Sequence, residues 1–442
     1  MTTNQEARAF VDRLAKAIAD HQVAAVVIES ELEPVTGPGA VIQPPTYLAS
    51  SSDPASKYAR FEGFMPQADD DGWFRHTQRD EHGRPVAVPA VVIDSLGSQA
   101  NRCEEALWGA RELVGGLPGV EISATPVTVE QVEDILRKKK LPTSSAADIQ
   151  QLVATAQISS WQTSHRHVDA HIRYAQEPGA DRAAWVSEGG LRDLIAGANS
   201  TRDASSAFGN FPNSLLFGFW LSSGTVERHR QARVYSSEVI GYNAQAARSG
   251  ASKYDDLPVS NKVALAASED GFTATPKASV AKKDRPSAWG FGMVPGEVEV
   301  HGFSCELILR RASVSFAALR AMRYGEHGQP KTHAAGVVLT CLALLGHHLS
   351  ALDSHLRSGC ELITVETRLG LRRLGHRAPE GLSISMTTDT LVDAVRVALA
   401  DAAQVGLTFA SPILATMSTS EVHQLVLSAA QALASGAEGA EE

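Results

Sequence analysis

The alternation of apolar and polar positions along the chain predicts interleaved helices and strands. Residues 5–20 carry apolar side chains at helical spacing, which indicates an amphipathic helix. Residues 23–32 form a β-branched run typical of a core strand. Further helices are predicted at 94–114, 129–140, 182–198, 315–323, 332–350, 387–403 and 420–435, and further strands at 86–93, 120–124, 214–222, 232–242, 298–314 and 360–367, the last of them. This pattern predicts an α+β or α/β class.

Two long segments interrupt the pattern and predict insertions. Residues 33–86 are rich in Pro, Gly, Ser and Asp, which indicates an irregular excursion. Residues 243–300 lack long apolar runs and are locally basic, since cations outnumber Asp284 there; these cations are Lys277, Lys282, Lys283 and Arg285. Residues 436–442 form a short acidic tail that we expect to be disordered. The expected organisation is one domain over residues 1–442 that carries these insertions.

Composition indicates an ordinary globular protein. The chain has 442 residues, 43% of them apolar, which is enough to bury a large core. Its longest apolar run, residues 334–346, is too short to cross a bilayer and is followed by two histidines. The first residues lack the cationic stretch and apolar run of a secretory signal. We therefore expect a cytoplasmic protein that does not contact a membrane.

Cysteine content and charge bear on the class of function. Four cysteines lie far apart without a C-x-x-C pair, which argues against a zinc ribbon and a disulfide framework. The formal net charge of −10 disfavours a nucleic-acid binder, because affinity for phosphates comes largely from Lys and Arg. It does not exclude one, since an acidic outer surface can coexist with a basic groove.

Catalytic and metal-binding patterns are weak in this chain. His165, His167 and His171 have a spacing at which two imidazoles could share a metal ion. No compact set of carboxylates accompanies them, and Arg166 and Arg173 would repel a cation. Neither Gly-x-Gly segment follows a strand and opens a helix, and a G-x-S-x-G nucleophile elbow is absent. We expect no catalytic residue, no metal and no cofactor.

Polar and guanidinium groups recur instead at the junctions between predicted elements. At a helix start, side chains and free backbone N–H groups can both address phosphate or 2′-hydroxyl oxygens. Each cluster alone could also be a solvated face or an internal ion pair. The clusters are Ser98, Gln99, Asn101 and Arg102; Arg228, Arg230 and Arg233; and Arg310, Arg311, Arg320 and Arg323.

Residues 92–107, V-I-D-S-L-G-S-Q-A-N-R-C-E-E-A-L, resemble the signature of the type I-G (formerly I-U) CRISPR-associated RAMP backbone family. Further segments resemble blocks of that family in matching order. These are S-H-R-H-V-D-A at 164–170, L-F-G-F-W at 216–220, and R-Q-A-R at 230–233 followed by Ser237 and Glu238. The resemblance covers residues 94–238, and its first block is the specific one.

This resemblance implies an α+β fold, with a modified RNA-recognition-motif (ferredoxin-like) palm and large finger- and thumb-like insertions; residues 243–300 are the candidate thumb. It implies a non-catalytic subunit that binds CRISPR RNA (crRNA), oligomerises along it with other effector subunits as caps, and presents the spacer to target DNA. The RNA contacts expected on this basis are Ser98, Gln99, Asn101, Arg102, His165, Arg166, Arg228, Arg230, Arg233, Lys282, Lys283, Arg285, Arg310 and Arg311.

One requirement and two alternatives accompany this hypothesis. The hypothesis requires that the Lys and Arg side chains line one continuous positively charged groove in which a guide strand can lie. A RAMP-superfamily endoribonuclease that processes precursor crRNA, with His165 or His167 as general acid or base, is the first alternative. A metal-dependent enzyme outside this superfamily is the second, and metal analysis of the pure protein would identify it.

Overall fold

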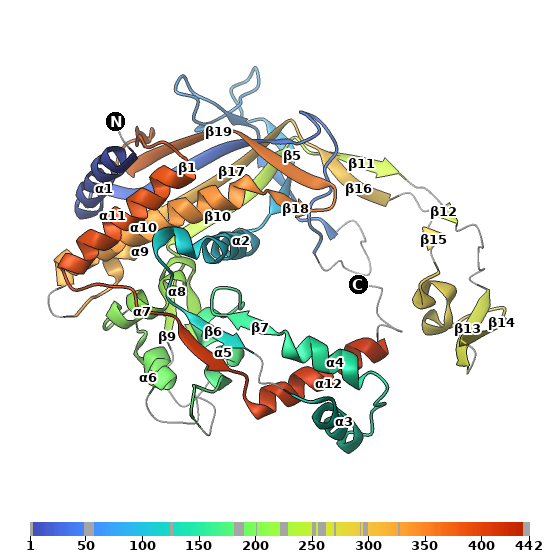
Figure 1. Cartoon of the computed structure of the whole chain (residues 1–442). Helices are drawn as coiled ribbons and strands as arrows, with labels where there is room; N and C mark the ends of the chain where they lie inside the picture. Colours follow the sequence, from blue (N-terminus) through green and yellow to red (C-terminus); the bar gives the residue numbers. More distant parts are fainter. Residues whose placement is uncertain are drawn as a thin grey trace. The chain divides into compact units, whose positions relative to one another are not determined.

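The computed structural model (Figure 1) describes most of the chain, in two compact units. The described residues are 3–47, 57–123, 127–180, 190–199, 201–221, 229–249, 253–254, 262–268, 271–291, 293–294, 299–325 and 328–435. The first unit comprises Met1–Ile122, Ile158–Ala247 and Gly302–Ala415. The second comprises Ser123–Gln157, Arg248–His301 and Thr416–Glu442.

A curled, antiparallel half-barrel sheet forms the centre of the first unit, within a mixed α+β fold. Its strand order is β18 (His355–Arg357), β19 (Cys360–Arg373), β1 (Val23–Pro34), β17 (Leu307–Ser315), β10 (Tyr235–Tyr242), β5 (Ala87–Asp94) and β2 (Arg60–Phe64), and β20 (Glu380–Gly381) also pairs with β19. All of these pairs are antiparallel. β2, β18 and β20 were not predicted, and β19 is longer than expected and is not the last strand.

Helices cover one face of this sheet, as Figure 1 shows. They are α1 (Thr3–Ala19), α2 (Leu96–Gly109), α10 (Gly328–Leu352) and α11 (Thr388–Gln404), with the short α9 (Phe316–Ala321) beside them. α10 is long and apolar enough to cross a membrane, but 72% of its most apolar window is buried inside the protein. It packs closely on α2, because a Cβ on Gly346 would lie 2.9 Å from the Leu107 side chain. α10 therefore has the position of a core helix.

The four central strands have a simple connectivity. Since neighbouring strands are antiparallel, β1 runs parallel to β10, and β17 runs parallel to β19. The connection from β1 to β10 contains α2, and the connection from β17 to β19 contains α10. Each parallel pair is thus joined by a crossover that carries a helix of the covering layer.

The first unit also contains short elements around the candidate site. They are β3 (Pro66–Gln67), β4 (His76–Thr77), η2 (Arg111–Val114), η3 (Arg166–Val168), α5 (Ala170–Tyr174), α6 (Gly190–Gly197), α7 (Ser205–Asn210), α8 (Pro212–Phe217), β8 (Phe219–Leu221) and β9 (His229–Gln231), and most of the three-stranded sheet β21 (Ile413–Thr416), β6 (Val120–Ser123) and β7 (Gln157–Ser159). The strand predicted at 214–222 was wrong over its first half. Pro212 begins a helix there, and Gly218, at φ 80°, ends it.

The second unit is built from helices and hairpins. Its helices α3 (Val129–Lys138), α4 (Ala146–Ala154) and α12 (Thr419–Ser435) pack together, and Thr128 and Gln131 form a capping box at the start of α3. Its other segment holds β12 (Lys253–Tyr254), β13 (Val263–Ser268), β14 (Gly271–Pro276), η5 (Lys282–Asp284), η6 (Pro286–Trp289) and β15 (Met293–Val294). β11 (Gln245–Ser249) and β16 (Glu299–Ser304) pair where this segment leaves the first unit. α4 was not predicted. The tail at 436–442 lies outside the described residues.

Candidate nucleic-acid interface

The start of α2 holds two of the predicted RNA contacts in internal bonds. Gln99 donates from Nε2 to Asp94 Oδ2 at 2.6 Å and accepts from Ser237 Oγ at 3.1 Å. Arg102 donates from Nε to the same carboxylate oxygen at 3.0 Å and from its Nη atoms to the carbonyls of His355 and Leu356. Asp94 is buried, and the Arg102 guanidinium compensates its charge while the Gln99 amide adds a hydrogen bond. Both side chains therefore tie α2 to the sheet.

Two other predicted contacts at α2 lie nearer to solvent. Asn101 is exposed and Ser98 is half-buried, and the Ser95 side chain caps the helix by accepting from Ser98 N. The exposed Arg233 lies beside this helix start, because its Nη2 is 3.9 Å from the place a Cβ on Gly97 would take. The first turn of a helix favours an anion through its dipole and its free N–H groups. Arg233 and the α2 start together can hold a phosphate.

Arg166 lies in a buried ion pair below this surface. Its Nε and Nη2 donate to the two carboxylate oxygens of Glu104 at 2.8 and 2.7 Å, and its Nη1 donates to Gly218 O at 2.8 Å. Asn213 adds a third donor to Glu104, whose side chain is 2% exposed. Burial raises the pKa of Glu104, and the Arg166 guanidinium opposes that rise. The Arg166 guanidinium thus serves a structural pair.

That pair also fixes the base of the β8–β9 hairpin. Gly218 has a left-handed φ of 80°, and a Cβ on it would lie 2.8 Å from Gln231 O and 3.1 Å from Arg233 N. Only glycine allows this close approach of the two strands. The Arg166 bond to the Gly218 carbonyl therefore holds the hairpin in place from below.

The β8–β9 hairpin carries an aromatic and a cation side by side. Trp220 is 69% exposed, and its register partner across the hairpin is the exposed Arg230. Directly opposed residues point to the same face of a strand pair. A solvent-exposed indole beside a guanidinium is an arrangement on which a nucleic-acid base can stack while its phosphate is bound. Arg228 lies outside the described residues.

Arg310 and Arg311 project from β17 to opposite faces of the sheet. Arg310 is 3% exposed and donates to Ser237 Oγ, the His347 carbonyl and Ser350 Oγ. Burial there lowers the pKa of His347 well below its usual value. Arg311 pairs with Glu29 at 2.9 Å on the other face. Arg310 is therefore part of the core, whereas Arg311 lines a cavity.

The other named arginines and histidines divide between core and surface. Arg320 donates to backbone carbonyls at the end of α1 and just after it, so it too is structural. His167 is fully buried, with Nδ1 2.7 Å from Ser214 Oγ. His165 is exposed, and its Nδ1 lies 3.3 Å from Asp169 Oδ2. Within the described ranges, no three His, Cys, Asp or Glu side chains lie close enough to share a metal ion.

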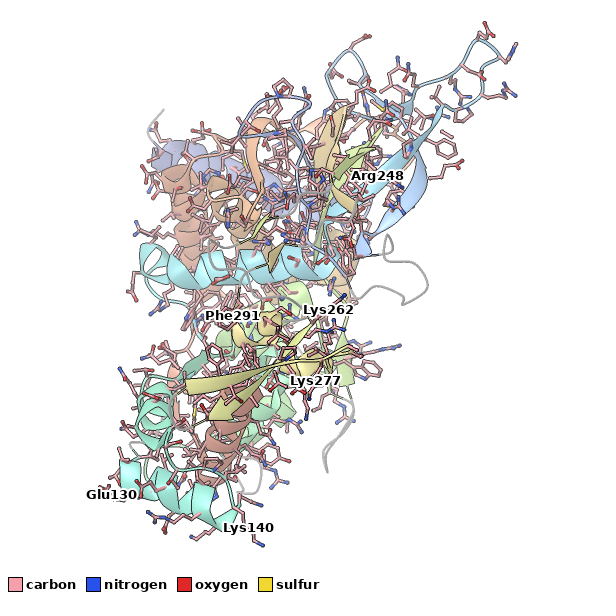
Figure 2. All side chains as sticks on the ribbon, turned by 90° about the vertical axis from the view of Figure 1, so that its right-hand side faces the viewer. Glu130, Lys140, Arg248, Lys262, Lys277 and Phe291 are labelled. Carbon is pink, nitrogen blue, oxygen red and sulfur yellow. The ribbon has the colours of Figure 1, made fainter. Side chains whose placement is uncertain are left out.

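The basic segment of the second unit presents cations and aromatic rings together. Lys282, Lys283 and Arg285 are exposed in and after η5. Lys262 and Lys277, marked in Figure 2, flank the β13–β14 hairpin, where Lys277 N donates to the Lys262 carbonyl. The rings of Phe272, Trp289 and Phe291 cluster on this segment, with centroids 6.1 and 5.4 Å from Phe272. Phe272 and Trp289 remain substantially exposed.

Comparison with known families identifies the chain through its first half. Residues 26–246 match the family described as CRISPR-associated protein GSU0053. The chain belongs to this family. It is therefore a CRISPR-associated protein that takes part in CRISPR immunity. No curated protein matches the chain.

The part that matches the GSU0053 family contains the whole interface of the first unit, from β1 through α2, Arg166 and the β8–β9 hairpin to β10. The basic segment after residue 248 lies beyond the match. Arg102, Arg166 and Arg310 are held internally, so they are not available to a single cationic groove. Exposed groups around the α2 start and the hairpin form the surface that remains.

Sequence reasoning missed the aromatic groups of this GSU0053-family surface. Trp220 was placed in the strand predicted at 214–222 without a role in binding, and Phe272 and Trp289 were not considered. A signal existed for Trp220, since its cross-strand neighbours come from the polar run 228–233, which a buried strand pair would not tolerate. No comparable signal marked the burial of Arg166, whose partner Glu104 lies far away in the sequence.

Proposed function

We propose that this protein is a non-catalytic, crRNA-binding backbone subunit of a type I-G CRISPR surveillance complex. In this role several copies bind one guide RNA by its backbone and present the spacer to target DNA. The exposed Trp220–Arg230 pair, on a hairpin anchored beside the α2 start and Arg233, is the observation that supports it most directly. Stacking and phosphate contacts of this kind tolerate any base sequence.

The strand connectivity supports an RNA-recognition-motif-like palm for this subunit. The four strands ordered β19-β1-β17-β10, with helices in both crossovers, follow the β-α-β-β-α-β path of ferredoxin-like folds. β5 and β2 extend the sheet beyond β10, and α1 and α11 extend the helical layer. The fold proposal therefore treats β5 and β2 as additions to the palm edge.

The basic segment at 243–300 is the proposed thumb, and its residues from Arg248 onward belong to the second unit. Its exposed lysines and its cluster of Phe272, Trp289 and Phe291 supply the cationic and stacking groups that a wedge in a single strand needs. The partners implied are crRNA, target DNA through the crRNA, further copies of this chain, and other effector subunits at the filament ends. The proposed location is the cytoplasm.

Binding of labelled single-stranded RNA tests the proposal. Wild-type affinity should be independent of sequence and should fall with salt. Trp220→Ala should cost roughly 1–3 kcal/mol of binding free energy, and Arg230→Gln should reduce the salt slope by about 0.7. Arg396→Gln, an exposed arginine on α11, is the matched control. RNA binding that neither salt nor these two substitutions weaken would exclude this role.

One geometric observation keeps a second candidate function open. The exposed His165 beside Asp169 has the arrangement of a carboxylate-oriented general acid or base. Such a pair could cleave precursor crRNA. Asp169 also caps α5 by accepting from His171 N, which gives the carboxylate a structural reason of its own. If His165→Ala abolished cleavage of a precursor transcript by the purified chain, the endoribonuclease would replace the backbone role.

A further inference from the structure

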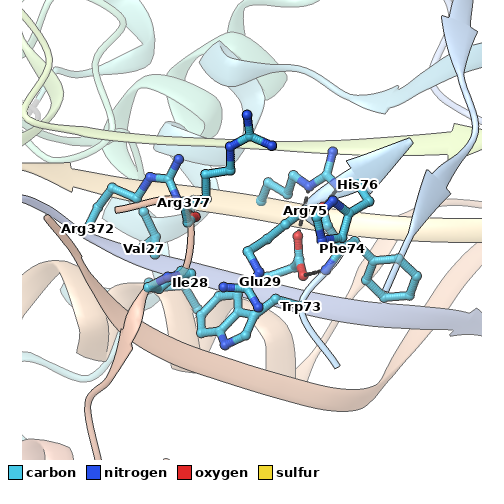
Figure 3. A pocket seen from close by; sticks show the side chains of 12 residues that line it. Val27, Ile28, Glu29, Trp73, Phe74, Arg75, His76, Arg372 and Arg377 are labelled. Atoms are coloured by element: carbon cyan, nitrogen blue, oxygen red, sulfur yellow. Dashed lines mark hydrogen bonds and ion pairs between the residues drawn. The ribbon is translucent and has the colours of Figure 1, made fainter. Parts of the chain in front are cut away.

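A cavity of about 550 Å³ opens on the sheet face that the helical layer does not cover. Arg310 contacts α10, and because side chains alternate along β17, Arg311 projects to the other face and lines this cavity. Strand β1 contributes Val27 and Glu29, and the remaining walls come from residues 73–76, 372, 377 and 379 (Figure 3). All of these residues belong to the first unit.

The segment before β4 is fixed to the sheet as the cavity wall. Phe74 N donates to Glu29 Oε1 at 2.8 Å, and Arg311 Nη2 donates to Phe74 O at 2.9 Å. The Trp73 indole lies against β19 at Gly370, where an added Cβ would come 3.1 Å from its Cζ2 and 2.8 Å from Pro379 Cβ. The glycine thus allows an aromatic ring to form part of the wall.

Charge in this cavity does not cancel. The Glu29 carboxylate uses one oxygen for Phe74 N and the other for Arg311 Nε, so its charge is compensated. Arg75 pairs with Asp69. Arg372 and Arg377 remain. Arg372 Nη1 donates to the Arg377 carbonyl, and within the described part of the chain no carboxylate lies within ion-pair distance of either guanidinium. The cavity therefore carries an excess of two positive charges.

We propose that this cavity binds a nucleotide by its terminal phosphate monoester, with Arg372 and Arg377 on the phosphate and the small exposed part of the Trp73 indole, which is 8% exposed, against the base. A phosphate monoester carries close to two negative charges near neutral pH, which matches the two guanidinium groups, and arginine binds phosphate through paired N–H donors. The volume lies in the usual range for small-molecule sites. A metal cation would be repelled, and an apolar ligand would leave both arginines desolvated.

Calorimetry with the full chain tests the ligand class. AMP and UMP should bind, inorganic phosphate should bind more weakly because it lacks the ring, and adenosine should bind least because it lacks the charge. If phosphate bound as tightly as AMP, the ring contact would be excluded. If neither AMP nor UMP bound, the site would be excluded.

Substitutions locate the binding. Arg372→Gln and Arg377→Gln should each weaken AMP binding roughly ten- to a hundredfold, because each removes a charge-assisted contact. Gly370→Ala should weaken it by displacing Trp73, and Arg396→Gln should not change it. AMP binding that is unchanged in both arginine variants, or that falls equally in Arg396→Gln, would overturn the proposal.

Two natural sources of the ligand can be separated in the double variant Trp220→Ala/Arg230→Gln, which lacks the proposed stacking and phosphate contacts. In that background, RNA binding that requires a 5′-phosphate and is lost when Arg377→Gln is added would identify the cavity's ligand as an RNA end. Binding of AMP but not of that RNA identifies a free nucleotide. The cavity proposal does not rest on the backbone role, so loss of AMP binding with RNA affinity intact would overturn this inference alone.

Discussion

Replacing Arg166 by Met tests whether this side chain is structural. The substitution preserves much of the side-chain volume and removes three hydrogen bonds, two to Glu104 and one to the Gly218 carbonyl. It leaves the Glu104 carboxylate, 2% exposed, with Asn213 as the remaining side-chain donor among the described residues. Breaking a buried pair in this way costs about 3–5 kcal/mol, since one charge stays buried and uncompensated.

That loss is large against a typical stability of about 5–15 kcal/mol. Urea denaturation followed by tryptophan fluorescence should therefore show a clearly lower midpoint for Arg166→Met. Adding Glu104→Gln to Arg166→Met should recover part of the stability, because it removes the uncompensated charge. The cycle of two single variants and the double variant isolates the coupling between these side chains.

RNA binding separates the structural role from the predicted RNA contact. Under conditions where Arg166→Met remains folded, its RNA affinity should stay close to that of the wild type, while Arg230→Gln should lose affinity without losing stability. A free energy of unfolding for Arg166→Met within about 1 kcal/mol of the wild-type value, together with a loss of RNA binding, would refute the structural role. The Arg166 guanidinium would then face RNA.

Three further substitutions test the core. Arg102→Ala should cost about 3 kcal/mol in urea denaturation, because Asp94 stays buried without its cation, and should leave RNA affinity unchanged; the opposite result would place Arg102 on the RNA. Burial lowers the pKa of His347, so this side chain is neutral in the folded protein. Below about pH 6.5 only the unfolded chain gains its proton, and the free energy of unfolding of the wild type should therefore fall by about 1.4 kcal/mol per pH unit. His347→Gln should lessen that slope, and an identical slope would contradict the assignment. Gly346→Ala should destabilise by about 1–3 kcal/mol, because its methyl group would press on Leu107, and a more stable variant would contradict that close contact.

The sequence predicted elements where apolar spacing and local caps agree. The helix predicted from residue 94 is α2, which Ser95 caps, and the strands predicted at 23–32 and 232–242 contain β1 and β10. It failed at 214–217, because a run of apolar residues fits a buried strand and a buried helix equally well, and only Pro212 argues for the helix. The connectivity of the four central strands depends on which strands pair over long distances, which no local pattern records.

The same limit explains which candidate site residues turned out to be exposed. Arg166 and Arg230 look alike in sequence, yet one meets Glu104 in the core and the other meets solvent on a hairpin. Burial of an arginine is decided by whether a distant carboxylate reaches it, because an unpaired buried charge would be too costly. The arginine clusters in the sequence therefore predicted more exposed positive charge than the fold presents.

The internal bonds of these arginines limit how an acidic chain can hold RNA. With Arg102, Arg166 and Arg310 committed internally, the exposed arginines among the predicted RNA contacts that the structure describes in the first unit are Arg230 and Arg233. Two phosphate contacts on a single strand give a salt slope of only about −1.4 per copy, so one subunit should bind RNA weakly. Copies that contact each other on one guide add their contacts at high effective concentration. Tight binding should therefore appear only on RNA long enough for several copies, and equal affinity for short and long RNA would argue against assembly.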